Sequence, residues 1–227
     1  MSVDIFNVAK AIEKLIFEFV MWLIFYPYTL FRVIFQPGYM IAYAARETER
    51  NEDVSFDSGM KPAIFLFLSI VLAAVLAPVQ QSELAELGDT QAGQYVIQSW
   101  FNLLFFRMVI YSIFPIVFAL VFDLLRPGGV TRNSLRLPFN QQCYICAPFA
   151  LVTSSSIILY GRTDNPVFLV ALIAAQLWLF GANVFFYKTQ LQKSAMAAFG
   201  LAMVTFIAAW VLFLTLTTLV LRFKGMS

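Results

Sequence analysis

The chain has 227 residues, of which 61% are hydrophobic and 12% are charged, and its formal net charge is +2. Ordinary soluble domains are about 45–50% apolar and about 25% charged, so this composition indicates an integral membrane protein. The small, scattered positive charge predicts no nucleic-acid surface. Histidine is absent from the sequence, which excludes Ser-His-Asp and Cys-His catalysis and any metal site that needs an imidazole ligand.

Residues 1–45 are apolar but irregular. Lys10, Lys14 and Glu18 follow one another at four-residue intervals and so share one face of a helix, while apolar residues fill another face. This pattern predicts an amphipathic helix that lies in the membrane interface or is partly inserted. The alternative is a short span broken by Pro27, or a re-entrant hairpin, over residues 15–31, because Glu18 is the one charge in that run.

Residues 46–61 are the most polar stretch and predict a solvated cytoplasmic linker. Beyond the linker, apolar runs near the roughly 20 residues that cross the hydrocarbon core recur along the chain. We therefore predict an all-α integral membrane protein, with a five-helix transmembrane bundle preceded by the amphipathic interfacial N-terminal helix. The membrane domain covers residues 62–222, with spans expected at residues 62–79, 95–123, 143–161, 167–187 and 194–221.

The charges between the spans predict an orientation. Residues 126–138 carry three arginines and no acid, residues 188–193 carry two lysines and no acid, and the charges of residues 80–94 are all acidic. Basic connections face the cytoplasm in most membrane proteins. We therefore expect the N-terminus in the cytoplasm and the C-terminus outside.

Arg107 is a full positive charge inside the second expected span. Its long side chain either snorkels to the headgroups of the outer leaflet or faces the interior of the bundle. An inward arginine needs polar acceptors, and it attracts an anionic lipid headgroup or substrate. The candidate polar site comprises Arg107, Gln98, Asn102, Gln176, Ser154 and Ser155.

Two prolines and two cysteines also lie in the expected spans. Pro115 and Pro148 remove backbone donors, so they predict helix kinks. Cys143 and Cys146 share one helical face, but two ligands cannot complete a tetrahedral zinc site, so we interpret them as small apolar side chains. We predict no catalytic, cofactor-binding or metal-binding residues.

The order of segments resembles a known family. It comprises "FRVIFQPGYMIAYAARE", a polar linker, "KPAIFLFLSIVLAAVL", an Arg/Pro/Gly connection and "FNQQCYICAPFALVTS". This order resembles the Yip family of five-span proteins, whose third span commonly opens with an aromatic residue shortly before a proline, as Tyr144 and Pro148 do here. Eukaryotic members of that family bind Rab-type GTPases. This chain lacks their long polar N-terminal domain and looks more like the bacterial members, which are sometimes labelled permease-like.

The resemblance and the composition together lead to two hypotheses. The first is a non-enzymatic protein of the bacterial inner membrane, a membrane-organising or accessory subunit that acts through lateral contacts. Its expected partners are membrane lipids and other membrane-protein chains or further copies of itself, and no nucleic acid. The second is a permease-like transporter or lipid-handling protein with a polar path near Arg107.

Overall fold

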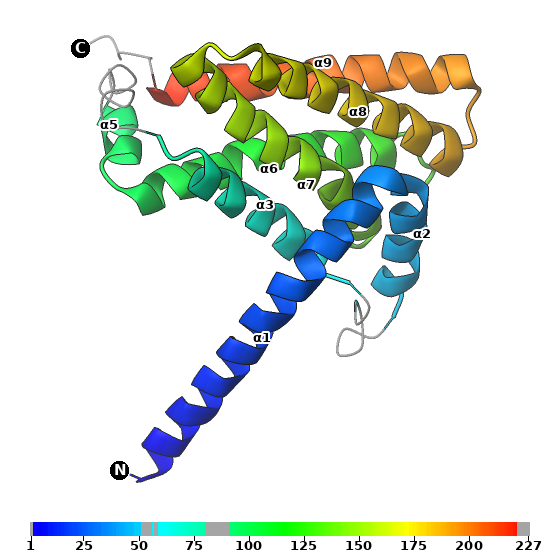
Figure 1. Cartoon of the computed structure of the whole chain (residues 1–227). Coiled ribbons are helices and arrows are strands. Elements are labelled where there is room, and N and C mark those ends of the chain that lie inside the picture. Colours follow the sequence, from blue (N-terminus) through cyan, green and yellow to red (C-terminus); the bar gives the residue numbers. More distant parts are fainter. Residues whose placement is uncertain (1, 51–55, 57–58, 80–90, 222–227) are drawn as a thin grey trace.

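The computed structural model describes the whole chain except residues 1, 51–55, 57–58, 80–90 and 222–227 (Figure 1). The described residues form helices and no strands. Most of the acidic segment at residues 80–94 lies outside the described residues, and so do residues 222–227 at the C-terminal end. The helices are α1 (Ser2–Phe35), α2 (Pro37–Thr48), α3 (Pro62–Leu76), α5 (Gln91–Ile97), α6 (Trp100–Leu124), α7 (Arg132–Thr163), α8 (Pro166–Gln190) and α9 (Ala195–Leu221).

Helix α7 is the centre of the bundle. It packs against α3, α6, α8 and α2, whereas α9 packs on α6 and α8. Residues 141–150 of α7 are all buried. The core is rich in aromatic rings, and Phe114 lies 4.8 Å from Phe149 and 5.4 Å from Trp210, measured between ring centroids. Such tilted and edge-to-face ring pairs add to the gain from burying their area.

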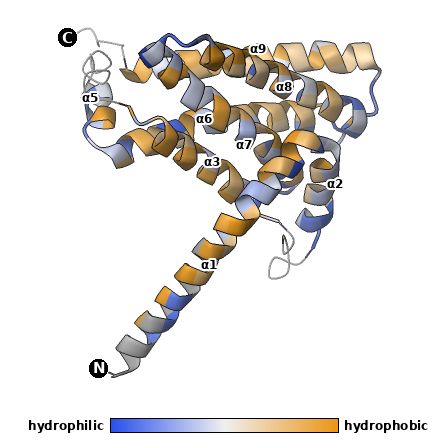
Figure 2. Cartoon of the chain, viewed as in Figure 1, coloured by the Kyte–Doolittle hydropathy of each residue, from blue (hydrophilic) through white to orange (hydrophobic). Residues whose placement is uncertain are grey.

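Polar residues fix the ends of the bundle helices. At the start of α6, the Ser99 hydroxyl accepts a hydrogen bond from the backbone N–H of Asn102 at 3.1 Å. At the start of α7, Thr131 and Ser134 form a reciprocal capping box. The Ser134 hydroxyl also donates to the buried carboxylate of Asp123 at 2.5 Å. The α6–α7 turn is therefore tied at both sides. Figure 2 shows hydrophobic residues along the bundle helices and hydrophilic residues gathered near helix ends.

Among the described residues, five helices are long and apolar enough to cross a membrane, as expected for an all-α membrane protein. These five helices differ from the five expected spans at one position, because the helix within residues 62–79 is too short to be among them and a stretch of α1 is included. The helix within residues 62–79 has only 15 residues, because Pro62 begins it and Pro78 follows its end at Ala77. The stretch Ile16–Phe35 of α1, which we left open as a span, has the necessary length and hydropathy.

Helix α1 leaves the bundle. It is a single helix of 34 residues that includes Pro27, and its N-terminal part extends away from the other helices (Figure 1). Only 12% of its most apolar stretch is buried. Its C-terminal part is attached, because the Tyr26 hydroxyl hydrogen-bonds Ser69 of α3 at 2.9 Å.

Candidate functional site

Arg107 faces the interior of the bundle. It lies in α6, about seven residues and so roughly 10 Å along the axis from Trp100, and only 9% of it is exposed. Of the two orientations that the sequence left open, the structure has the inward one. The described residues offer Arg107 no hydrogen bond and no ion pair, and Tyr111, one turn further along α6, is the group that interacts with its charge.

Gln98 and Asn102 do not join Arg107. Gln98 is exposed between α5 and α6. The Asn102 side chain donates instead to the carbonyl of Tyr95 at 2.8 Å, while its backbone N–H is held by Ser99. These two residues therefore shape the corner between α5 and α6.

The hydroxyl run of α7, residues 153–156, is buried. Ser154 lies beside the hydroxyl of Tyr111, so it continues the polar contact from Arg107 across to α7. The hydroxyl oxygen of Ser155 has no hydrogen-bond partner in the part of the chain that the structure describes. Unpaired polar atoms in a membrane interior are uncommon and mark polar sites.

Gln176 ties three helices together. Its amide nitrogen donates to the Thr153 hydroxyl of α7 at 3.1 Å, and its amide oxygen accepts from the indole N–H of Trp210 in α9 at 3.2 Å. We call Thr153, Gln176 and Trp210 the amide bridge. Because Thr153 precedes Ser154, the amide bridge and the Arg107 group adjoin through the backbone of α7.

Three buried amides were not singled out from the sequence. Gln141 is fully buried and donates to the carbonyl of Ile41 at 3.1 Å. Gln142 is equally buried, and neither polar atom of its amide has a partner within the described ranges. Asn183 donates to the carbonyl of Leu179 at 3.1 Å, but its own oxygen has no partner there. The paired glutamines of "FNQQCYIC" are the sequence feature that could have indicated two of them.

Neither proline nor the cysteine pair adds reactive chemistry. Pro115 and Pro148 lie within the continuous helices α6 and α7, and the kinks expected of them stay a prediction. Cys143 and Cys146 are free thiols and fully buried among apolar neighbours. Between them, Tyr144 donates a hydrogen bond to the carbonyl of Met60. The described residues contain no group of three or more Cys, Asp or Glu side chains that could hold a metal ion.

The fold and the buried side chains define an all-α polytopic membrane protein with polar groups inside its bundle. The comparisons with protein-family models, with curated proteins and with solved structures gave no match. The resemblance to the Yip family therefore stays a prediction.

Proposed function

We propose that this chain is a non-enzymatic membrane-organising or accessory subunit that acts through lateral contacts with lipids and other membrane-protein chains. The observation that carries the proposal is α1, which is long, apolar and largely without partners in its own chain. An exposed apolar helix in a membrane protein needs cover from lipid or from a second protein.

The exposed side chains of α1 are large and apolar. Phe17 is 61% exposed and Leu23 is 68% exposed. Lys10 and Glu13 are exposed nearer the N-terminus, which gives this part of the helix the mixed character of an interfacial segment. The described contacts of α1 with the bundle lie toward its C-terminal end, where Tyr26 contacts Ser69 and the carbonyl of Ile34 accepts from Trp178.

The outer faces of α8 and α9 supply a second surface for lateral contacts. Gly181 and Gly200 each have open space where a β-carbon would stand, whereas Ala182, Ala198 and Ala202 are buried in the bundle. Small residues on a lipid-facing surface let another helix approach closely. This supports a protein partner alongside lipid.

The location and orientation belong to the same proposal. We propose a bacterial inner membrane, with the N-terminus in the cytoplasm and the C-terminus outside. The arginines of residues 126–138, which cover the α6–α7 turn and the first turns of α7, and the lysines of residues 188–193, which cover the end of α8 and the turn to α9, support this orientation. Segments rich in Lys and Arg at the ends of spans stay on the cytoplasmic side.

Purification tests the proposal. The full chain extracted in a gentle detergent is expected to carry a second protein chain, a further copy of itself or bound lipid, as seen by native mass spectrometry. Leu23→Glu places a charge on the exposed face of α1 and is expected to reduce that association. The matched control is Gln98→Glu, because Gln98 is exposed on the corner between α5 and α6. A monomer with neither partner nor lipid would contradict the proposal.

A transporter or lipid-handling protein is a second candidate, favoured by Arg107. A buried arginine without a carboxylate partner among the described residues attracts an anion. Arg107→Met removes the charge and keeps a long apolar side chain. Proteoliposomes containing the parent are expected to move anionic solutes or lipids faster than those containing Arg107→Met, and equal rates would remove this candidate.

A further inference from the structure

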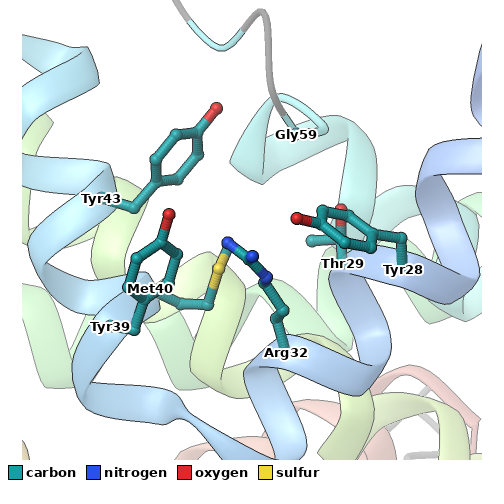
Figure 3. A pocket seen from close by; sticks show the side chains of 7 residues that line it. All are labelled: Tyr28, Thr29, Arg32, Tyr39, Met40, Tyr43 and Gly59. Atoms are coloured by element: carbon teal, nitrogen blue, oxygen red, sulfur yellow. The ribbon is translucent and has the colours of Figure 1, made fainter.

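A small pocket lies where α1 meets α2. Its lining side chains come from the last turns of α1, from α2 and from the segment just before α3 (Figure 3). Its cavity volume is about 10 Å³, which leaves room for one oxygen-sized group at its base and not for a whole organic ligand. It is lined by Tyr28, Thr29, Arg32, Tyr39, Met40, Tyr43 and Gly59.

Arg32 supplies the charge of this pocket. Its guanidinium carbon lies 4.7 Å from the ring centroid of Tyr28 and 4.6 Å from that of Tyr39. The two rings fix the position of the guanidinium through cation–π contacts, which leave its N–H groups available. Within the part of the chain that the structure describes, no carboxylate pairs with Arg32 and no acceptor hydrogen-bonds it.

Thr29 supplies an unused hydroxyl. It lines the pocket, it is only 1% exposed, and its hydroxyl oxygen has no hydrogen-bond partner among the described residues. A buried hydroxyl without a partner costs free energy unless a ligand completes it. In Figure 3 the hydroxyls of Tyr28 and Tyr39 and the guanidinium of Arg32 lie around the same opening. Four donor groups of two neighbouring helices therefore meet here.

A second arginine stands beside a ring that lines the pocket, because the guanidinium carbon of Arg46 lies 5.9 Å from the ring centroid of Tyr39. Glu47, also in α2, is engaged elsewhere, because its carboxylate pairs with Arg50 at 3.0 Å and accepts from the backbone N–H of Phe56 at 2.8 Å. The pocket thus offers donors and positive charge to an anion.

The surroundings point to lipid as the source of that anion. Phe31 precedes Arg32 and Phe35 lies about one helical turn after it; their side chains are 62% and 66% exposed and contact each other with ring centroids 4.6 Å apart. The pocket also stands at the end of the apolar stretch Ile16–Phe35, just before the polar residues of α2. A site at that boundary lies at the depth of lipid headgroups, and exposed aromatic rings there contact acyl chains.

We propose that Arg32, Thr29, Tyr28 and Tyr39 bind the phosphate of an anionic phospholipid headgroup. One phosphate oxygen enters the cavity and accepts from Thr29, and a second oxygen accepts from the guanidinium of Arg32. The rest of the lipid stays outside the pocket along Phe31 and Phe35. This inference rests on the proposed function in one respect, namely that α1 is in contact with lipid.

Native mass spectrometry of the purified full chain in non-ionic detergent tests the site with three probes. They are a short-chain phosphatidylglycerol, the diacylglycerol with the same chains, and inorganic phosphate. Phosphatidylglycerol is expected to bind one saturable site at least about tenfold more tightly than either other probe, because only it combines phosphate and acyl chains.

Variants assign the binding to the pocket. Arg32→Gln is expected to weaken phosphatidylglycerol binding about tenfold or more, since hydrogen bonds to a charged ligand are lost. Thr29→Val keeps the stacking of Arg32 and is expected to weaken binding about threefold or more. Arg126→Gln is the matched control, because Arg126 also stacks on a ring, that of Phe122 at 5.5 Å, but lies in the turn after α6. It is expected to bind as the parent does.

Three results would overturn the inference. Parent-like affinity for phosphatidylglycerol in both Arg32→Gln and Thr29→Val would show that the pocket is not the binding site. If Arg32→Gln folds poorly, parent-like affinity in Thr29→Val alone would show it. Equal binding of diacylglycerol removes the role of the phosphate. Equal binding of inorganic phosphate, lost in Arg32→Gln, assigns the pocket to free phosphate and removes the lipid. None of these results bears on whether Leu23 meets another protein chain, so the proposed function is tested separately.

Discussion

The indole N–H of Trp178 in α8 donates to the backbone carbonyl of Ile34 at 3.2 Å, near the end of α1. This hydrogen bond, with that between Tyr26 and Ser69, fixes the C-terminal part of α1 on a bundle from which its N-terminal part departs. The attached end carries the Arg32 pocket, and the departing end carries the exposed apolar surface.

Trp178→Phe is expected to loosen the attachment of α1. The variant keeps a ring in the partly buried site and loses one hydrogen bond, for an expected destabilisation of about 1 kcal/mol. Hydrogen exchange of the amides in the last turns of α1 should become faster. Trp100→Phe is the control, because Trp100 is 46% exposed and its change should leave that exchange unaltered. Unchanged exchange in Trp178→Phe would contradict this role.

Gln176→Leu is expected to break the amide bridge. The change leaves the Thr153 hydroxyl and the Trp210 indole without their partner, and hydrogen bonds between membrane helices contribute on average about 0.6 kcal/mol each. We expect a loss of roughly 1 kcal/mol in the free energy of unfolding, measured by denaturation in mixed micelles. Gln98→Leu, at an exposed position, should lose less. Equal losses in the two variants would show that the bridge adds nothing.

Tyr144→Phe is expected to destabilise the contact between α7 and the start of α3. Tyr144 is fully buried, and its hydroxyl donates to the carbonyl of Met60. The variant leaves that carbonyl unpaired, at a cost of about 1–3 kcal/mol. Thermal unfolding in detergent measures the change. Tyr95→Phe is the control, because Tyr95 is 65% exposed. A melting temperature that falls no further in Tyr144→Phe than in this control would refute the expectation.

The thiols of Cys143 and Cys146 are expected to resist alkylation in the folded protein, because neither residue is more than 1% exposed. N-ethylmaleimide should modify them only after denaturation, as followed by intact mass. Gly161→Cys provides an accessible comparison, since Gly161 is exposed and has open space at its β-carbon position. Rapid modification of the parent would place the thiols at an accessible surface.

Much of the fold could be predicted from the sequence, because uncharged runs of about 20 residues have few alternatives to membrane helices. The apolar run at residues 62–79 is longer than the helix that it forms, because Pro62 and Pro78 confine the helix to the 15 residues of α3. Hydropathy alone indicates the length of the run and not that of the helix. The start of α7 at Arg132 was also hidden, since its first turns are polar and include Pro138. Hydropathy therefore indicates membrane crossing better than it indicates where a helix begins.

The candidate site was predicted less completely. Arg107 and Ser154 are buried inside the bundle, and the partly buried Gln176 hydrogen-bonds α7 and α9, whereas Gln98 and Asn102 belong to the corner between α5 and α6. A single sequence does not state which face of an apolar helix turns inward when nearly every face is apolar. The Arg32 pocket was missed for a different reason, because it joins residues of two helices and the segment before α3 that only packing brings together.

Site-specific photo-crosslinking from Leu23 in intact membranes tests the central proposal most directly. Leu23 is 68% exposed on α1, and Phe65 of α3, which is fully buried, is the comparison position. We predict that a photoreactive residue at position 23 crosslinks to a second protein chain or to lipid, whereas one at position 65 crosslinks within its own chain. Crosslinks from position 23 only to this chain's own bundle would contradict the account.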